Sequence, residues 1–237
     1  MAPVRHPPRN PRREFDREAR HYDRTASATM PRYAELHRML AWGVPHLPTR
    51  PLRILELGPG TGTLTELLLE SFPHAQVEGV DLSPAMVTLA RRKLARFRAR
   101  VTLRVGELDA LPGETKYDVI VSCLAIHHLV EERKRRLFRR VYEALTPGGY
   151  FGDGDDHLPE DSRFDERFSA LASSLSRPQP RTGRRERDVL QKVWHAHEYF
   201  DHPVPLSQEV QWLREAGFVH LDTPWRFFNQ AVVWAYR

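Results

Sequence analysis

Three glycines and a glutamate stand close together after an apolar run. The stretch ILELGPGTGTLTELL, residues 54–68, places Gly58, Gly60 and Gly62 at alternate positions, with Glu56 two residues before the first of them. Glycines this dense allow a sharp turn or the close approach of a ligand to the main chain. The spacing differs from the G-x-G-x-x-G pattern of dinucleotide-binding loops. A carboxylate fits poorly beside a pyrophosphate and well beside an ammonium group, so the loop indicates a cofactor with an amino-acid end.

A second group of polar residues follows the next two apolar runs. Asp81 ends the stretch VEGVD, where a carboxylate can accept hydrogen bonds from ribose hydroxyls. The alternative role, a cap for the next helix, is weaker because Ser83 is available for it. In GELDALP, Glu107 or Asp109 could accept a hydrogen bond from the exocyclic amine of an adenine. Met86 could pack on the ring face or simply belong to the core.

The hydrophobic pattern predicts the elements that position these residues. Helical spacing covers residues 14–27 and 31–44, and from residue 52 short apolar strands alternate with amphipathic helices. This rhythm predicts a parallel sheet with helices on both faces. Near the end, a helix over 206–218 precedes two further strands. The predicted strands are 52–57, 75–82, 100–105, 117–124, 149–155, 219–225 and 229–237, and the helices of the central part are 63–72, 83–97 and 131–145.

Five motifs in a fixed order resemble one family. The run LELGPGTG, GVDLSPAMV, GELDALP, YDVIVSCLAIHHL and ALTPGGYF resembles the class I S-adenosylmethionine-dependent methyltransferases, closely over residues 50–155 and more loosely outside them. The resemblance implies a Rossmann-like α/β fold. Its sheet has seven strands, mostly parallel, with helices on both faces. Residues 229–237 would form the one antiparallel strand.

The resemblance also implies roles for particular residues around S-adenosyl-L-methionine. Glu56 and the three glycines would surround its methionine portion, Asp81 would hold the ribose, and Glu107 would stand near the adenine. In similar enzymes N-terminal helices fold over the cofactor as a lid. Tyr22 and Tyr33 lie on the corresponding helices here and are therefore expected to contact the cofactor. The expected cofactor-binding residues are Glu56, Gly58, Gly60, Gly62, Asp81, Leu82, Met86, Glu107, Leu108, Ser122, Cys123, Leu124, Tyr22 and Tyr33, of which 122–124 would line the floor beneath the sulfonium.

Four residues are candidates for catalysis on the acceptor side. His127 and His128 follow the fourth strand, and because neighbouring side chains of an extended chain point in opposite directions, at most one is expected to face the pocket. Asp153 and Asp155 belong to DGDDH, residues 153–157, and could contact an amine or hydroxyl of the acceptor. The same stretch has the ligand types of a metal site, but it equally fits an acidic loop at the mouth of the pocket or a helix cap. No metal is therefore expected.

The composition of the chain limits which other classes of protein it could belong to. The chain of 237 residues has a formal net charge of +5, and one cysteine, Cys123, excludes an internal disulfide framework. Its charge is mostly arginine, in runs at 91–100 and 133–140 that are expected to form solvated helix faces. The absence of a long apolar run or a secretory signal favours a cytoplasmic protein without membrane spans. Five regions are expected: a disordered basic arm (1–13), a helical lid (14–50), the cofactor-binding core (51–156), a helical substrate cap (157–200) and the closing helix and strands (201–237).

The function that fits best is the transfer of a methyl group to oxygen or nitrogen of a small-molecule acceptor, with carbon as a further option. S-adenosyl-L-homocysteine would be the product, the acceptor could be a secondary metabolite, and a homodimer is a further option. Two alternatives remain open. The opening and closing segments also resemble relatives that modify a tRNA wobble uridine, for which the basic composition is weak support. The second alternative is a protein that binds the cofactor but transfers no methyl group.

Overall fold

The computed structural model describes residues 11–30, 32–111, 113, 115–167, 170–171 and 201–237. A seven-stranded sheet forms its centre, with the strand order β3-β2-β1-β4-β5-β7-β6. The chain turns from β1 to β2 and β3 on one side and then places β4 on the other side of β1. The strands are β1 (Arg53–Leu57), β2 (Gln76–Asp81), β3 (Val101–Val105), β4 (Tyr117–Cys123), β5 (Leu145–Asp156), β6 (His220–Phe227) and β7 (Gln230–Tyr236).

The strand directions confirm the predicted mixed sheet. Strand β7 runs antiparallel to both of its neighbours, β5 and β6, and the other pairs are parallel. The order reverses between β1 and β4, and in open sheets of this kind ligands bind beyond the carboxyl ends of the strands at that point. The fold therefore marks the loops after β1 and β4 as the place to look for a site.

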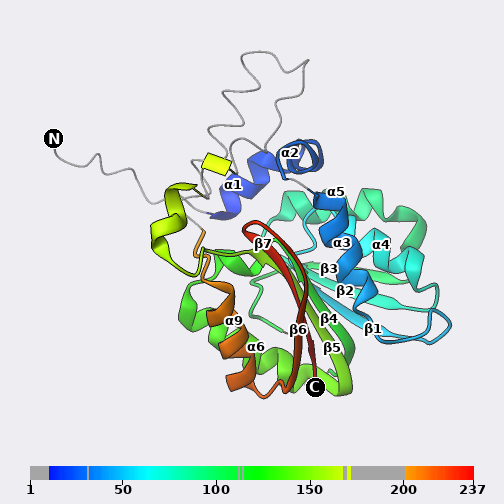
Figure 1. Ribbon diagram of the computed structural model, residues 1–237. Helices are drawn as coiled ribbons and strands as arrows, with labels where there is room; N and C mark the ends of the chain where they lie inside the picture. Colours follow the sequence, from blue (N-terminus) through cyan, green and yellow to red (C-terminus); the bar gives the residue numbers. More distant parts are fainter. Residues whose placement is uncertain (1–10, 31, 112, 114, 168–169, 172–200) are drawn as a thin grey trace.

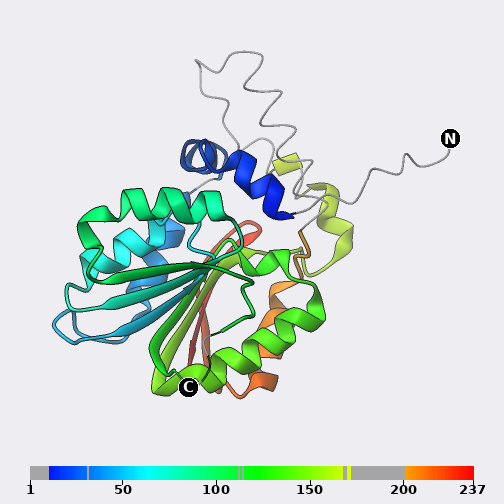
Figure 2. The same cartoon turned by 180° about the vertical axis from the view of Figure 1, so that it is seen from behind.

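Helices cover both faces of the sheet (Figures 1 and 2). On one face, α6 (Glu131–Ala144) packs against α9 (Leu206–Ala216), with Phe138 and Trp212 buried in a shared core. On the other face lie α3 (Tyr33–Trp42), α4 (Thr63–Ser71) and α5 (Pro84–Lys93). Their apolar sides, including Leu40 and Leu68, form a second core. Each such buried side chain contributes about 1.5–3 kcal/mol of hydrophobic free energy.

Two short helices lie across the carboxyl ends of the strands (Figures 1 and 2): α1 (Pro11–Glu18) and α2 (Tyr22–Thr29). The prediction of one helix over 14–27 is wrong, because the chain turns at residues 19–21 between them. Helix α1 also begins inside the predicted arm. Proline at a first helical position loses no hydrogen bond, since its missing N–H would have had no partner in the helix. The rest of the arm lies outside the described residues.

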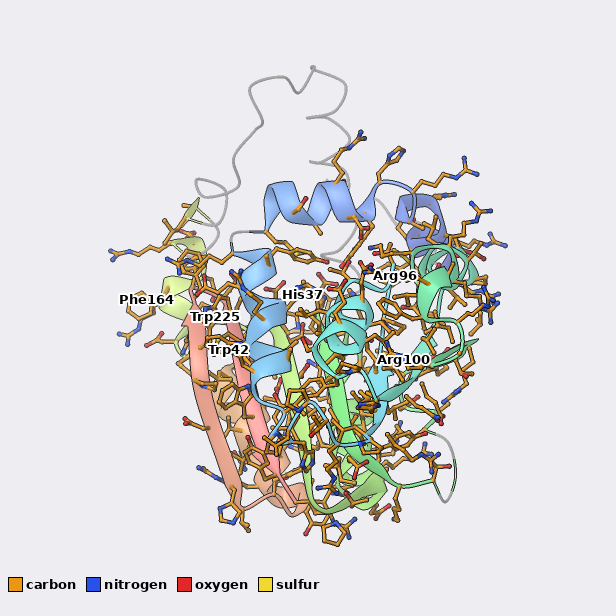
Figure 3. The ribbon with its side chains drawn as sticks, turned by 90° about the vertical axis from the view of Figure 1, so that its right-hand side faces the viewer. His37, Trp42, Arg96, Arg100, Phe164 and Trp225 are labelled. Atoms are coloured by element: carbon orange, nitrogen blue, oxygen red, sulfur yellow. The ribbon has the colours of Figure 1, made fainter. Side chains whose placement is uncertain are left out.

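Two arginines from the first arginine run make contacts within the protein on the α4 side (Figure 3). Arg96 pairs with Glu66 at 3.0 Å and also with Glu70. Arg100 donates hydrogen bonds to the carbonyls of Leu69 and Phe72, at 3.1 and 3.2 Å, and so caps the end of α4. These two side chains serve the fold, which weakens the case for a nucleic-acid surface here.

The segment after β5 is described only up to residue 171, apart from 168–169. It pairs Leu158 with Pro205 in an isolated bridge and forms a short turn, η3 (Ser162–Phe164). Most of the predicted cap lies outside the described residues. Among the helices that are described, none has the length and apolar character that crossing a bilayer requires.

Candidate functional site

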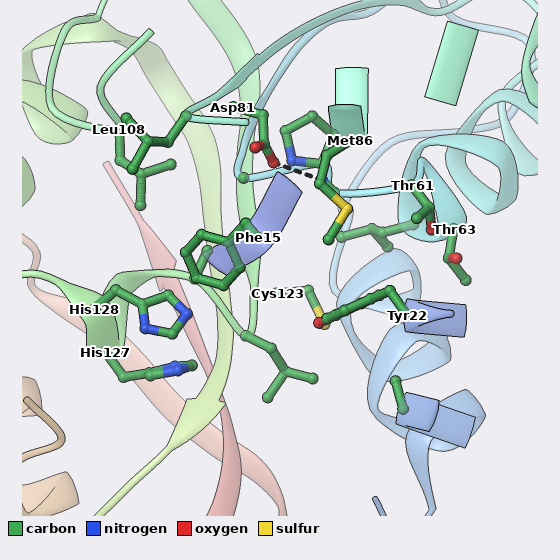
Figure 4. Close-up of a pocket in the computed structure, with 18 of the residues that line it drawn as sticks. Phe15, Tyr22, Thr61, Thr63, Asp81, Met86, Leu108, Cys123, His127 and His128 are labelled. Carbon is green, nitrogen blue, oxygen red and sulfur yellow. Dashed lines mark hydrogen bonds between the residues drawn. The ribbon is translucent and has the colours of Figure 1, made fainter. Parts of the chain in front are cut away.

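A cavity of about 830 Å³ lies beyond the carboxyl ends of β1, β2 and β4, at the predicted point of strand reversal. Helices α1 and α2 form its roof, with Phe15 and Tyr22 directed into it (Figure 4). The glycine loop and Asp81 line one end. His127 and His128 line the other.

The glycine loop needs its glycines for two different reasons. Gly58, Gly60 and Gly62 have φ angles of +72°, +54° and +87°, in the left-handed region that side chains disfavour. A Cβ added at Gly58 would lie 2.5 Å from the Cβ of Ala125, so no side chain fits there. A Cβ at Gly60 would meet nothing within 4 Å. The main chain at Gly60 is thus open to the cavity, as a loop that holds a ligand must be.

Asp81 ties this loop to the next one. Its two carboxylate oxygens accept hydrogen bonds from the N–H groups of Gly60 and Ser83, both at 2.8 Å (Figure 4 shows the first). Burial raises the pKa of Asp81, and these two hydrogen bonds oppose the rise. Ser83 caps α5 by accepting from the N–H of Met86, as predicted. Asp81 is therefore free to face the cavity with its remaining lone pairs.

Glu56 is a buried carboxylate at the floor of the cavity with little to stabilise its charge. It is 1% exposed and accepts one hydrogen bond, from the hydroxyl of Thr65 at 2.5 Å. Burial raises its pKa from 4.5 to about 7, although the hydrogen bond from Thr65 opposes the rise. Such a group fits a cationic ligand group, and the ammonium of an amino-acid end would supply one. The cavity therefore fits S-adenosylmethionine at this end.

Glu56 leads to a prediction about pH. Between pH 4.5 and pH 7 the folded, cofactor-free chain holds a proton on Glu56 that the unfolded chain has lost, so this group's contribution to stability falls as the pH rises. A bound ammonium group favours the charged carboxylate, so binding should release that proton. We expect cofactor affinity to fall about tenfold from pH 7.5 to pH 6. Calorimetry in two buffers of different ionisation enthalpy measures the proton release.

Glu56→Gln is the matched control for that experiment, because it keeps the shape and removes the titration. Its affinity should be lower at pH 7.5 and nearly flat across the same range. An unchanged pH profile in this variant would mean that another group titrates.

Most of the predicted cofactor residues line this one cavity. Gly62 does not; it starts α4 and packs near Leu94. Ser122 of β4 does not line the cavity either, whereas its neighbour Cys123 does, because alternate side chains of a strand point to opposite faces. The predicted cofactor residues that line it are Tyr22, Tyr33, Glu56, Gly58, Gly60, Asp81, Leu82, Met86, Glu107, Leu108, Cys123 and Leu124.

Glu107 lines the cavity, whereas Asp109 does not. Arg133 of α6 joins the two, at 2.9 Å from Glu107 and 2.6 Å from Asp109. Arg133 also lines the cavity. This arginine belongs to the second arginine run and fixes the loop at the predicted adenine end.

Both histidines face the cavity, which corrects the expectation that at most one could. Residues 126–128 form a 3-10 turn, η2 (Ile126–His128), rather than extended chain, and the two rings lie side by side with centroids 3.9 Å apart. The ring of Phe15 from α1 meets His128 edge-on at 5.0 Å (Figure 4). The two histidines thus lie beneath α1 and α2, which form the lid of the cavity.

Asp155 holds His127 from behind. It accepts hydrogen bonds from the backbone N–H of His127 at 2.8 Å and from its ring Nδ1. Burial alone would lower the pKa of His127, but Asp155 and the nearby Asp201 outweigh it and raise that pKa to about 9. Burial and the neighbouring His127 lower the pKa of His128 to about 4. Asp155 does not line the cavity and acts through His127.

Asp153 lies away from the cavity, contrary to its place among the catalytic candidates. Its side chain is 1% exposed in β5 beside Glu209 of α9, and burial and that neighbour raise its pKa well above the usual range. Asp156, at the end of the same strand, lines the cavity instead.

Three aspartates that the sequence pattern did not single out lie at or beside the site, and of these Asp201 lines the cavity. Asp201 follows the cap, and its Oδ1 lies 2.8 Å from Nδ1 of His128 and 3.7 Å from Nε2 of His127. Asp16 of α1 accepts from the hydroxyl of Ser83 at 2.6 Å. Asp23 of α2 accepts from the hydroxyl of Thr61 and pairs with Lys93 at 2.6 Å. The acidic character of Asp16 and Asp23, on helices expected to cover the cofactor, could have indicated contacts to the cofactor loops. Nothing near Asp201 in the sequence indicated its place in the site.

Asp16 and Asp23 anchor the lid to the loops that carry Asp81 and Gly60. Removing one anchor should loosen the lid, and partly exposed pairs contribute about 0–1 kcal/mol. We expect Asp23→Ala to weaken cofactor binding about two- to fivefold, mainly through faster release. Stopped-flow fluorescence would measure the rate. Glu70→Ala, which removes an exposed ion pair outside the cavity, is the control; equal rates in both variants would contradict the anchoring role.

Known proteins are similar to this chain in sequence and in fold. A family model described as a methyltransferase domain matches residues 55–151. The carboxy-S-adenosyl-L-methionine synthase of Campylobacter lari is 24% identical over 217 residues, which are 91% of each chain. The malonyl-[acyl-carrier protein] O-methyltransferase of Priestia megaterium is 31% identical over 148 residues, 60% of this chain and 52% of that protein. The chain thus spans about half the length of the second relative.

A solved structure shares the fold. Human N-acetylserotonin methyltransferase in complex with S-adenosylmethionine superposes with a TM-score of 0.63 at 14% identity, over 94% of this chain and 56% of that one. Fold, glycine loop and domain match define a methyltransferase. The chain matches a methyltransferase domain over residues 55–151, and its fold is that of the class I S-adenosylmethionine-dependent methyltransferases.

Proposed function

We propose that this protein transfers a methyl group to oxygen or nitrogen of a small-molecule acceptor. One observation carries the proposal: a single covered cavity joins the glycine loop and Asp81 to the histidine pair. Its volume of about 830 Å³ falls within the range of about 300–1,000 Å³ typical of small-molecule sites. A lid over such a cavity suits a small acceptor better than a folded nucleic acid.

At the cofactor end, we assign each residue the contact that its chemistry favours. Glu56 faces the ammonium group, the open main chain at Gly60 borders the methionine portion, and Asp81 accepts from the ribose hydroxyls. Glu107 and Leu108 border the adenine, with Met86 on its face. Cys123 and Leu124 lie beneath the sulfonium; burial raises the pKa of the Cys123 thiol, which keeps it neutral and unreactive there.

At the acceptor end, the chain's task is orientation and exclusion of water. When bound, S-adenosyl-L-methionine supplies a methyl group that its sulfonium has already activated. The lid residue Phe15 and the two histidines confine the acceptor at the far end of the cavity. Holding an acceptor in line can supply several kcal/mol of the barrier. Asp155 contributes by fixing the ring of His127.

A second candidate activity is modification of the cofactor itself. The relative from Campylobacter lari, matched over 91% of both chains, is a carboxy-S-adenosyl-L-methionine synthase. The cofactor end of the cavity would serve either reaction equally. The two differ in their product, which mass spectrometry distinguishes.

The test is turnover of S-adenosylmethionine with a trideuterated methyl group, using the full chain and a panel of small phenols, alcohols, amines and acids. We expect S-adenosylhomocysteine together with a deuteromethylated acceptor, and neither product with Asp81→Ala. A carboxylated cofactor would favour the second candidate. Methylation of tRNA but of no small molecule would overturn the small-molecule assignment, and binding without turnover would indicate a non-methylating role.

A further inference from the structure

The acceptor end of the cavity carries three metal-ligating side chains that the methyl-transfer proposal leaves without an assigned reaction. His127, His128 and Asp201 each offer one ligand atom, and these atoms lie within 4.8 Å of one another. All three residues line the cavity. They come from two segments, residues 126–128 and residue 201, which meet through a hydrogen bond from the N–H of His202 to the carbonyl of His127 at 2.7 Å.

The two separations that involve Asp201 are close to those that a small cation requires. Metal–nitrogen and metal–oxygen bonds of about 2.0–2.1 Å place neighbouring ligand atoms roughly 3.0–3.4 Å apart. Oδ1 of Asp201 lies 2.8 Å from Nδ1 of His128 and 3.7 Å from Nε2 of His127, which brackets that range. A proton can join only two of these atoms, whereas a cation between them can bind all three.

Neighbouring residues hold the three candidate ligands in place. Asp155 binds Nδ1 of His127 and so turns Nε2 toward Asp201. A carboxylate behind a ligating histidine is a common feature of metal sites, because it fixes the ring and raises its basicity. Lys134 of α6 is 1% exposed and donates a hydrogen bond to the carbonyl of His202 at 2.5 Å, which fixes the backbone next to Asp201.

We propose that His127, His128 and Asp201 bind one divalent first-row transition-metal ion, such as Fe²⁺, Mn²⁺ or Zn²⁺, at the acceptor end of the cavity. Two imidazoles and a carboxylate favour these ions over Mg²⁺ and Ca²⁺, which prefer oxygen ligands. With three protein ligands, the remaining positions face the cavity. As part of the proposed methyl transfer, the ion would act there as a Lewis acid that lowers the pKa of an acceptor hydroxyl, whose proton would pass to solvent.

The experiment is direct binding of Co²⁺ and Zn²⁺ to the full chain, stripped with a chelator and freed of any histidine tag. We expect one equivalent, with visible Co²⁺ absorption from a site of low symmetry, and at least a 100-fold loss of affinity in His128→Ala and in Asp201→Asn. His74→Ala, an exposed histidine outside the cavity, should bind like the wild type.

S-adenosylhomocysteine binding is measured on every variant. Retained binding shows that the fold and the cofactor end are intact, so a failure of the metal proposal remains separate from a failure of the methyltransferase assignment. Absence of stoichiometric binding to the wild type would overturn the metal site. Binding that is equal in His128→Ala, Asp201→Asn and His74→Ala would also overturn it.

Discussion

Replacing Gly60 by valine is expected to raise the dissociation constant for S-adenosylmethionine at least 100-fold, about 2.7 kcal/mol. Two effects act together. The φ of +54° at Gly60 is strained for a β-branched residue. The new side chain would also enter the open space where the cofactor approaches the main chain, since no atom now lies within 4 Å of that Cβ position. Calorimetric titration measures the loss directly.

The matched control is Gly113→Val. Gly113 is exposed, has room for a Cβ and lies outside the cavity, and its φ is not in the left-handed region. We expect wild-type affinity for this variant. Gly60→Ala separates the two effects, because alanine adds the backbone strain with little bulk. Wild-type binding by a folded Gly60→Val protein, as judged by circular dichroism, would refute the assignment of this loop.

Asp81→Ala is expected to weaken cofactor binding by about 100- to 1,000-fold. The change removes the acceptor for the N–H groups of Gly60 and Ser83, each at 2.8 Å, as well as the proposed ribose contact. Hydrogen bonds that involve a charged group contribute about 1.5–3 kcal/mol each. Asp81→Asn, which retains one acceptor oxygen, should fall between alanine and the wild type.

Asp118→Ala controls for the loss of a carboxylate that accepts a backbone hydrogen bond. Asp118 accepts from the N–H of Arg53 at 2.9 Å, on the amino-terminal side of β4 and away from the cavity. The Asp118→Ala substitution should lower the free energy of unfolding and leave cofactor affinity nearly unchanged. If both aspartate variants lost affinity equally, the effect of Asp81 would be general destabilisation rather than a contact in the site.

The cofactor end was predictable because its geometry is local. Gly58, Gly60 and Glu56 belong to one strand–loop–helix unit, whose bend follows from residues in direct succession. Asp81 ends the strand beside it, and parallel strands bring their carboxyl ends to one edge of the sheet. The antiparallel direction of residues 230–236 followed from the family resemblance and is confirmed.

The acceptor end depended on contacts between distant segments. The 3-10 turn at Ile126–His128 turned both rings to one side, and the amphipathic periodicity of strands and helices cannot indicate such a turn. Asp201 reaches the histidines only because α9 and the segment before it pack beside α6. Asp16 and Asp23 meet the cofactor loops across separations of 67 and 38 residues.

By itself, then, the sequence determined the order of strands and helices, the glycine loop and the carboxylates that follow β1 and β2, because backbone freedom and hydrophobic period act between near neighbours. The tertiary structure decided which side chains share the acceptor end, that Asp153 and Ser122 are buried away from it, and that the lid is held by two aspartates. Those outcomes depend on how separate elements pack, since burial and pairing free energies arise only when the segments meet.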